Sequence, residues 1–143
     1  MSPALNTPTD IHHWCRNFPG TTDQVREARH FITSYLGNRP ETDTAHLVIT
    51  ELATNAIRHT SSGLPGGHFG VTLHTTSTLL ILVVLDEGSP TTPHLRQAAN
   101  DDQTGRGLHL VDTLTARWGV YGNQAGRTVW ALLPLTPTTP RAA

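Results

Sequence analysis

The sequence contains no lysine, and all ten basic residues among its 143 are arginines. This absence excludes Schiff-base chemistry on a lysine amine, a Walker-type phosphate loop and the catalytic lysine of the common protein-kinase fold. Cysteine is almost as scarce, because Cys15 is the only one. No disulfide can therefore form within the chain, and we expect a reducing compartment.

Long apolar runs and an excess of one charge are also absent. The longest apolar run is seven residues, Leu79 to Leu85, which is far short of the roughly 20 that a membrane helix needs. Residues 1–10 carry no basic residue and no apolar run, so they do not read as a signal peptide. The net charge of −1 gives no basic surface for nucleic acid. We expect one cytoplasmic domain that binds neither a membrane nor nucleic acid directly.

Amphipathic segments separated by turns make up the rest of the chain. Apolar periodicity predicts strands near 12–18, 69–73, 79–85, 118–121 and 127–133, and helices over about 23–36, 41–60 and from 105 onward. Few helices beside mainly antiparallel strands indicate an α+β fold, a two-layer α/β sandwich with a mixed, mainly antiparallel sheet and the helices on one face. We place the domain at 11–134, a long loop at 89–104, and disordered ends at 1–10 and 135–143.

The second predicted helix carries a polar stripe along an otherwise apolar surface. Glu51, Asn55 and His59 recur every four residues, so each steps only about 40° around the helix, and Arg58 lies at the edge of the stripe. Six residues form the apolar surface beside it: Ala45, Val48, Ile49, Leu52, Ala53 and Ala56. The stripe is either a solvated face or a site in which Glu51 orients or deprotonates a nucleophile and the Asn55 amide oxygen suits Mg²⁺. A lone helical histidine such as His59 is more often structural.

A second candidate follows the most apolar strand. Asp86 ends that strand, and its carboxylate could accept a hydrogen bond from an exocyclic amine such as that of adenine. Gly88 would let a flat ring approach the backbone. The alternative is an ordinary turn that binds no ligand.

A third candidate is the run Gly105-Arg106-Gly107-Leu108 at a predicted helix start. Backbone N–H groups there could converge on phosphate oxygens, and Arg106 could add a charge-assisted contact. The alternative is a glycine-capped junction, because no complete Gly-x-Gly-x-x-Gly fingerprint is present.

In this order, the three motifs resemble those of the GHKL ATPase superfamily (gyrase, Hsp90, histidine kinase, MutL) and its Bergerat ATP-binding fold. Glu51-Leu-Ala-Thr-Asn55-Ala-Ile-Arg-His59 matches the N box, Asp86-Glu-Gly88 the G1 box, and Gly105-Arg-Gly107-Leu108 the G2 box. The loop 89–104 falls where that family has its ATP lid. The likeness covers about residues 12–133.

The resemblance implies a role for each matched residue. Glu51 is implied as the base, Asn55 as the Mg²⁺ ligand, Asp86 as the reader of adenine, and Gly105 to Leu108 as the phosphate site. Thr128 lies in Gly126-Arg127-Thr128, which looks like the last strand of the family, where a threonine commonly supports the adenine site. The residues implied to bind ATP are Asn55, Arg58, His59, Asp86, Gly88, Gly105, Arg106, Gly107, Leu108 and Thr128.

Within the superfamily, the short chain is similar to anti-sigma factor kinases of the SpoIIAB and RsbW type, and to their small actinobacterial members in particular. That similarity implies binding of a sigma factor and phosphorylation of a serine or threonine on a STAS-domain anti-anti-sigma protein. Such proteins commonly dimerise, so a homodimer is an expectation to test. By the same analogy the first helix would contribute to the partner surface, with Arg26 and Arg29 exposed.

Two departures from the family pattern leave a second function open. Pro90 replaces the second glycine of the G1 box, and proline fixes φ and lacks an N–H, so the backbone approach there must differ. The cations available near the lid are only Arg96 and Arg106. The alternative function is a non-catalytic module that sequesters a sigma factor or another regulator, with ATP as a structural ligand or absent. Glu51 and Asn55 favour the kinase, because a pure binding module needs no base.

Overall fold

The structure is a computed structural model that describes residues 11–89 and 109–136. Its elements follow in the order β1 (His12–Pro19), α1 (Gln24–Leu36), α2 (Thr42–His59), a 3-10 turn η2 (Ser61–Gly63), β2 (His68–Thr75), β3 (Leu79–Asp86), β4 (Arg117–Asn123) and β5 (Gly126–Pro134). Residues 109–114 are also helical.

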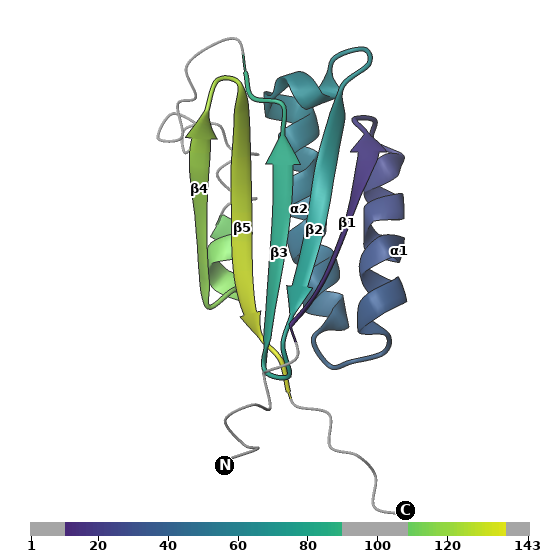
Figure 1. The fold of residues 1–143 in the computed structure, drawn as a ribbon, viewed down its shortest axis with the longest axis vertical. Coiled ribbons are helices and arrows are strands. Elements are labelled where there is room, and N and C mark those ends of the chain that lie inside the picture. Colours follow the sequence, from purple (N-terminus) through teal and green to yellow (C-terminus); the bar gives the residue numbers. More distant parts are fainter. Residues whose placement is uncertain (1–10, 90–108, 137–143) are drawn as a thin grey trace, which may run out of the picture.

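The strands form one five-stranded sheet in the order β1-β2-β3-β5-β4 (Figure 1). We expected a mixed sheet in which antiparallel pairs dominate, and each of the four pairings between these strands is antiparallel. β2 and β3 form a hairpin, as do β4 and β5. The two hairpins join where β3 pairs with β5, although these strands are far apart in the sequence.

The helices cover a single face of the sheet (Figure 1). The six apolar residues predicted for the inner surface of α2 are all buried. They share the core with the inward side chains of the central strands, such as Leu73 of β2 and Leu80, Leu82 and Val84 of β3. The predicted two-layer α+β sandwich is therefore confirmed, and it places α2 behind the middle of the sheet.

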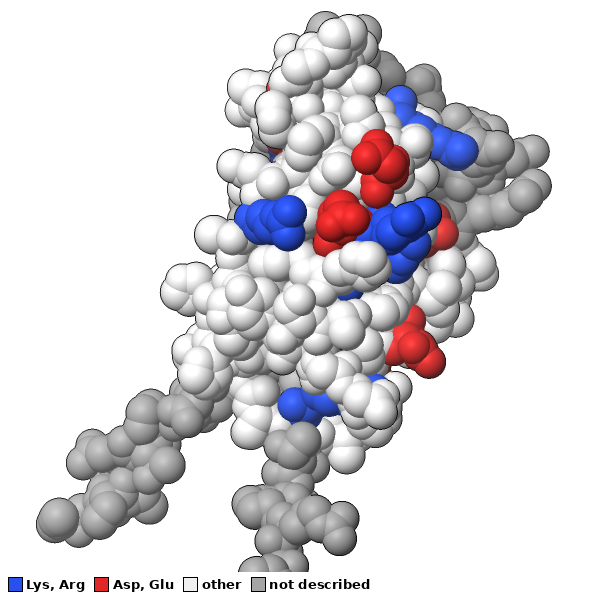
Figure 2. All heavy atoms as spheres, turned by 90° about the vertical axis from the view of Figure 1, so that its right-hand side faces the viewer, with Lys and Arg blue, Asp and Glu red and all other residues white. Residues whose placement is uncertain are grey.

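α1 packs along one flank of α2. Arg29 Nη1 donates a hydrogen bond to Thr50 Oγ1 at 3.1 Å, and Thr33 Oγ1 lies 2.6 Å from His46 Nε2. Arg29 is therefore half-buried and hydrogen-bonded to α2, contrary to our expectation of an exposed residue. Arg26 is exposed, as expected. Charged side chains of both signs lie interspersed on the face that contains α1, so no patch of one sign forms there (Figure 2).

The packed domain reaches beyond the boundary at residue 134. Leu135 is buried, and its N–H donates to the carbonyl of Thr78 at 2.7 Å. The Thr136 hydroxyl and N–H both donate to Glu41 Oε2, at 2.6 and 3.0 Å. The last strand is thus tied to the start of α2, and residues 135–136 belong to the domain rather than to a tail. Among the described residues, no helix has the length and apolar character to cross a membrane.

Candidate functional site

The polar stripe of α2 lies on the flank turned away from α1. Thr50 faces α1, and at 100° per residue Glu51 and Asn55 point about 100° and 140° away from it. Both are half-buried, and neither side chain makes a hydrogen bond or an ion pair within residues 11–89 and 109–136. The helical residues 109–114 cover the sheet on that side of α2 (Figure 1). A carboxylate and an amide thus lie half-buried on the flank of α2 away from α1.

The remaining two residues of the stripe are at the end of α2. Arg58 and His59 are both exposed in its last turn. The helix ends at Thr60, whose hydroxyl donates to the carbonyl of Ala56 at 2.6 Å and accepts the N–H of Ser62 at 3.0 Å. The stripe therefore runs from a half-buried middle to a solvent-exposed end.

Asp86 lies on the same face of the sheet as α2. It follows Leu82 and Val84 in the inward alternation of β3, and its side chain is only 2% exposed. Its Oδ1 accepts the N–H of Gly88 at 2.7 Å, and its Oδ2 lies 3.4 Å from Nε of Arg127. Each carboxylate oxygen can accept more than one hydrogen bond, so Asp86 keeps acceptor capacity for an amine.

Gly88 has a structural reason to be glycine besides the access that we expected it to give a ligand. Its φ is +75°, and a Cβ there would lie 2.0 Å from the carbonyl oxygen of Gln124. Its own carbonyl accepts the N–H of Ser61 at 2.6 Å, and Ser89 N–H donates to Gln124 at 3.1 Å. The loop after Asp86 is thus hydrogen-bonded on one side to the β4–β5 turn and on the other to the 3-10 turn after α2.

Ser62 positions this loop, and the sequence did not single it out. Its side chain is buried, and Oγ accepts the N–H of Glu87 at 2.9 Å. The carboxylate of Glu87 in turn accepts the N–H of His68 at 2.6 Å. The hydroxyl-rich run after α2 indicated only a loop, and the partner of the Ser62 hydroxyl could not be inferred from the sequence.

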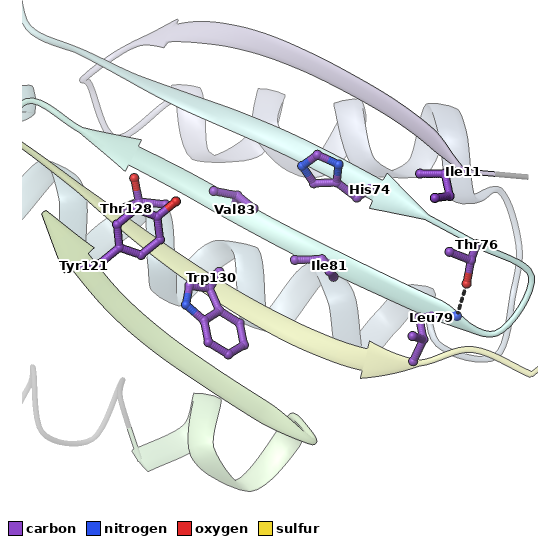
Figure 3. A pocket seen from close by; sticks show the side chains of 9 residues that line it. All are labelled: Ile11, His74, Thr76, Leu79, Ile81, Val83, Tyr121, Thr128 and Trp130. Carbon is purple, nitrogen blue, oxygen red and sulfur yellow. Dashed lines mark hydrogen bonds between the residues drawn. The ribbon is translucent and has the colours of Figure 1, made fainter. Parts of the chain in front are cut away.

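Thr128 is not brought together with Asp86. It pairs with Leu85, and its side chain lines a groove of about 410 Å³ on the face of the sheet away from the helices (Figure 3). Trp130 and Ile81 line the same groove. Arg127 is the residue beside Asp86. Because neighbouring residues on a strand point to opposite faces, the expectation that Thr128 supports the group bound by Asp86 does not hold in this structure.

The other predicted site residues, Gly105, Arg106, Gly107 and Leu108, lie outside the described residues, as does the loop 89–104 beyond Ser89. Within the described ranges no three His, Cys, Asp or Glu side chains are grouped as metal ligands.

Residues 18–133 match the model of a protein family described as the histidine kinase-like ATPase domain. The chain belongs to this family. The matched range contains Glu51, Asn55 and Asp86. As a histidine kinase-like ATPase domain, the chain is an ATP-binding domain, and the GHKL resemblance is confirmed at this level.

The fold of this ATPase domain is similar to that of a solved structure. A chain in the crystal structure of the SiaB–SiaC complex from Pseudomonas aeruginosa superposes with a TM-score of 0.54 at 14% sequence identity. The match covers 93% of this chain and 95% of the other. At this identity the likeness shows a shared fold. A sequence search of curated proteins finds no match.

Proposed function

We propose that this ATPase domain is an anti-sigma factor and a regulatory serine/threonine protein kinase. It would bind a sigma factor and phosphorylate a STAS-domain anti-anti-sigma protein in the cytoplasm. The observation that carries the proposal is the half-buried Glu51–Asn55 flank of α2, on the same face of the sheet as the buried carboxylate of Asp86. A base and a metal ligand serve phosphoryl transfer from ATP, and an acceptor for an amine serves recognition of its adenine.

Each group has one role in the proposed reaction. Asp86 accepts a hydrogen bond from the adenine amine, and Asn55 would hold Mg²⁺, which would neutralise phosphate charge. Gly105, Arg106, Gly107 and Leu108 hold the phosphates. Arg58 and His59, exposed at the end of the α2 stripe, are further candidates for nucleotide contact.

In the transfer step, the hydroxyl oxygen of the partner's serine or threonine attacks the γ-phosphorus of ATP. The bond between the γ-phosphorus and the β–γ bridging oxygen breaks, and ADP leaves. Glu51 accepts the hydroxyl proton. Catalysis is therefore mainly positioning and charge neutralisation, with Glu51 as the single proton acceptor that the chain must supply.

The partners are proposed on two grounds. A chain of similar fold is part of the SiaB–SiaC complex, which supports a function in binding another protein. The sigma factor and the STAS protein come from the motif resemblance, as does the proposed homodimer.

The test combines a binding measurement with a transfer measurement. The full chain is titrated calorimetrically with ATP, with and without Mg²⁺, and is then mixed with [γ-³²P]ATP and STAS proteins encoded by the same organism. We expect Mg²⁺-dependent binding and label on one STAS protein. Glu51→Gln should keep ATP binding within about twofold and lower the transfer rate by about a hundredfold or more, because only the proton acceptor is lost.

A matched control is Asp43→Asn, the same carboxyl-to-amide change at an exposed position in the first turn of α2. It should leave both measurements unchanged. Transfer at the native rate by Glu51→Gln would show that Glu51 is not the base. ATP binding without transfer to any STAS protein, together with capture of a sigma factor, would favour the non-catalytic binding module.

A further inference from the structure

Arg127 lies directly opposite Asp86 where β3 pairs with β5, on the face of the sheet that the helices cover. Its Nε is 3.4 Å from Asp86 Oδ2, and the two side chains are 12% and 2% exposed. The carboxylate proposed to read adenine therefore has a guanidinium as its immediate neighbour.

The hydrogen-bonding capacity of this guanidinium is unused in the described residues. Nε is buried without a hydrogen-bond partner, and the only charged contact of the group there is Asp86. An arginine that served only to neutralise a carboxylate would be expected to form short, paired hydrogen bonds with it. A buried N–H without an acceptor costs free energy, so the geometry suggests an acceptor that a ligand supplies.

We infer that Arg127 is a specificity-determining residue for the purine base. It donates an N–H to the ring nitrogen that flanks the amine of adenine, N1 or N7, while Asp86 accepts from the amine itself. This inference rests on the proposed function, because it requires ATP in the site.

The chemistry of the two partners is complementary. Adenine presents an N–H donor beside a ring-nitrogen acceptor, and the Asp86–Arg127 pair presents a carboxylate acceptor beside N–H donors. Thr128 cannot supply this donor, because it faces the opposite side of the sheet. Arg127 thus takes the place that we had expected Thr128 to hold.

A purely structural ion pair makes a different prediction. If Arg127 only held Asp86 in position, its loss would lower the affinity for ATP and for both deaza analogues by the same factor. If Arg127 contacts the base, its loss removes the discrimination against an analogue that lacks the contacted nitrogen. The ratio of affinities therefore separates the two roles.

The experiment is a calorimetric titration of the full chain with Mg²⁺ and ATP, 1-deaza-ATP or 7-deaza-ATP. Wild-type protein should bind one of the two analogues about tenfold or more weakly than ATP, the size expected for one hydrogen bond to a charged donor. Arg127→Met should bind ATP and that analogue within about twofold of each other, and Arg127→Lys should keep part of the discrimination. Arg117→Met, at an exposed arginine of β4, should behave as wild type.

Two results would overturn the inference alone: wild-type protein that binds ATP and both analogues equally, or Arg127→Met that keeps the wild-type ratio. The first needs no variant, so the test stands even if Arg127→Met does not fold, which thermal unfolding will show. Failure of wild-type protein to bind ATP at all would instead overturn the proposed function and this inference with it.

Discussion

Gly88 fixes the path of the chain directly after Asp86. Its positive φ and its contact with the carbonyl of Gln124 leave no room for a side chain. The loop that carries the backbone donor to Asp86 thus depends on one residue type at one position. Any substitution there should disturb both the packing of the β4–β5 turn and the position of the Asp86 carboxylate, which accepts the N–H of Gly88.

Gly88→Ala should lower the free energy of unfolding by about 3 kcal/mol, of which about 1 comes from the positive φ and the rest from overpacking. Gly66→Ala is the matched control, because Gly66 has a φ of +80° and no atom lies within 4 Å of the position that a Cβ would take there. It should cost only about 1 kcal/mol. Urea unfolding of the three proteins measures both values, and equal losses would show that the contact with Gln124 is not restrictive.

At the scale of elements, the buried hydroxyl of Ser62 links the end of α2 to the end of β3. Its side chain is buried and accepts the N–H of Glu87 in a part-buried hydrogen bond. Together with the bond from the Ser61 N–H to the carbonyl of Gly88, it ties the helix that carries Glu51 to the strand that carries Asp86.

Ser62→Ala should destabilise the domain by about 1–3 kcal/mol, because it leaves the N–H of Glu87 without its acceptor. Ser34→Ala removes an exposed hydroxyl that bonds only within α1, and it should change stability by less than about 0.5 kcal/mol. Chemical denaturation followed by circular dichroism gives both numbers. A loss no larger for Ser62 than for Ser34 would refute the link.

The helices could be predicted from the sequence more fully than the faces of the strands. A 3.6-residue period separates the apolar and polar sides of α2 clearly, so the stripe and the buried surface could both be inferred. β3 is apolar on both faces, and β5 is nearly so. Neither strand therefore shows the alternation of polar and apolar residues that would indicate which side chains face the helices. For that reason the sequence could not show that Arg127, rather than Thr128, faces inward.

The turn before β5 shows the same limit. The predicted strands near 118–121 and 127–133 left residues 122–126 between them, but β4 runs to Asn123 and β5 begins at Gly126. Asn123 Oδ1 accepts the N–H of Ala125 at 2.8 Å, which closes a two-residue turn. The register of β5 against β3 follows from long-range pairing, which no local pattern encodes.

For the molecule as a whole, Glu41 and Thr136 join the start of α2 to the end of the last strand. The Thr136 hydroxyl, followed by its N–H and by Arg39, lowers the pKa of Glu41 below its usual value of 4.5 against the opposing effect of burial. Because the folded-state pKa is the lower one, this carboxylate stabilises the fold above the unfolded pKa. The contribution is lost as the pH falls through the folded pKa.

Glu41→Gln should therefore be less stable than wild type at about pH 7, and this difference should shrink as the pH is lowered to about 3, below the pKa of this carboxyl in the unfolded chain. Urea unfolding of both proteins at the two pH values is the measurement. In a Thr136→Ala background the pH-dependent part of the difference should be smaller, since the main cause of the lowered pKa is gone. A difference that is the same at both pH values would contradict the assignment.

The pairing of β3 with β5 has a consequence for the order in which the protein assembles. Each hairpin, β2–β3 and β4–β5, closes over a short turn, whereas their junction must bring together distant parts of the chain. Asp86 and Arg127 lie across that junction, so the base site that we propose can form only once the two halves have met. A nucleotide that binds there would bind only the chain in which the two hairpins are joined. At a hundred times its dissociation constant it would stabilise the joined sheet by about 2.7 kcal/mol, so the ATP level of the cell would influence how long each copy of the protein persists.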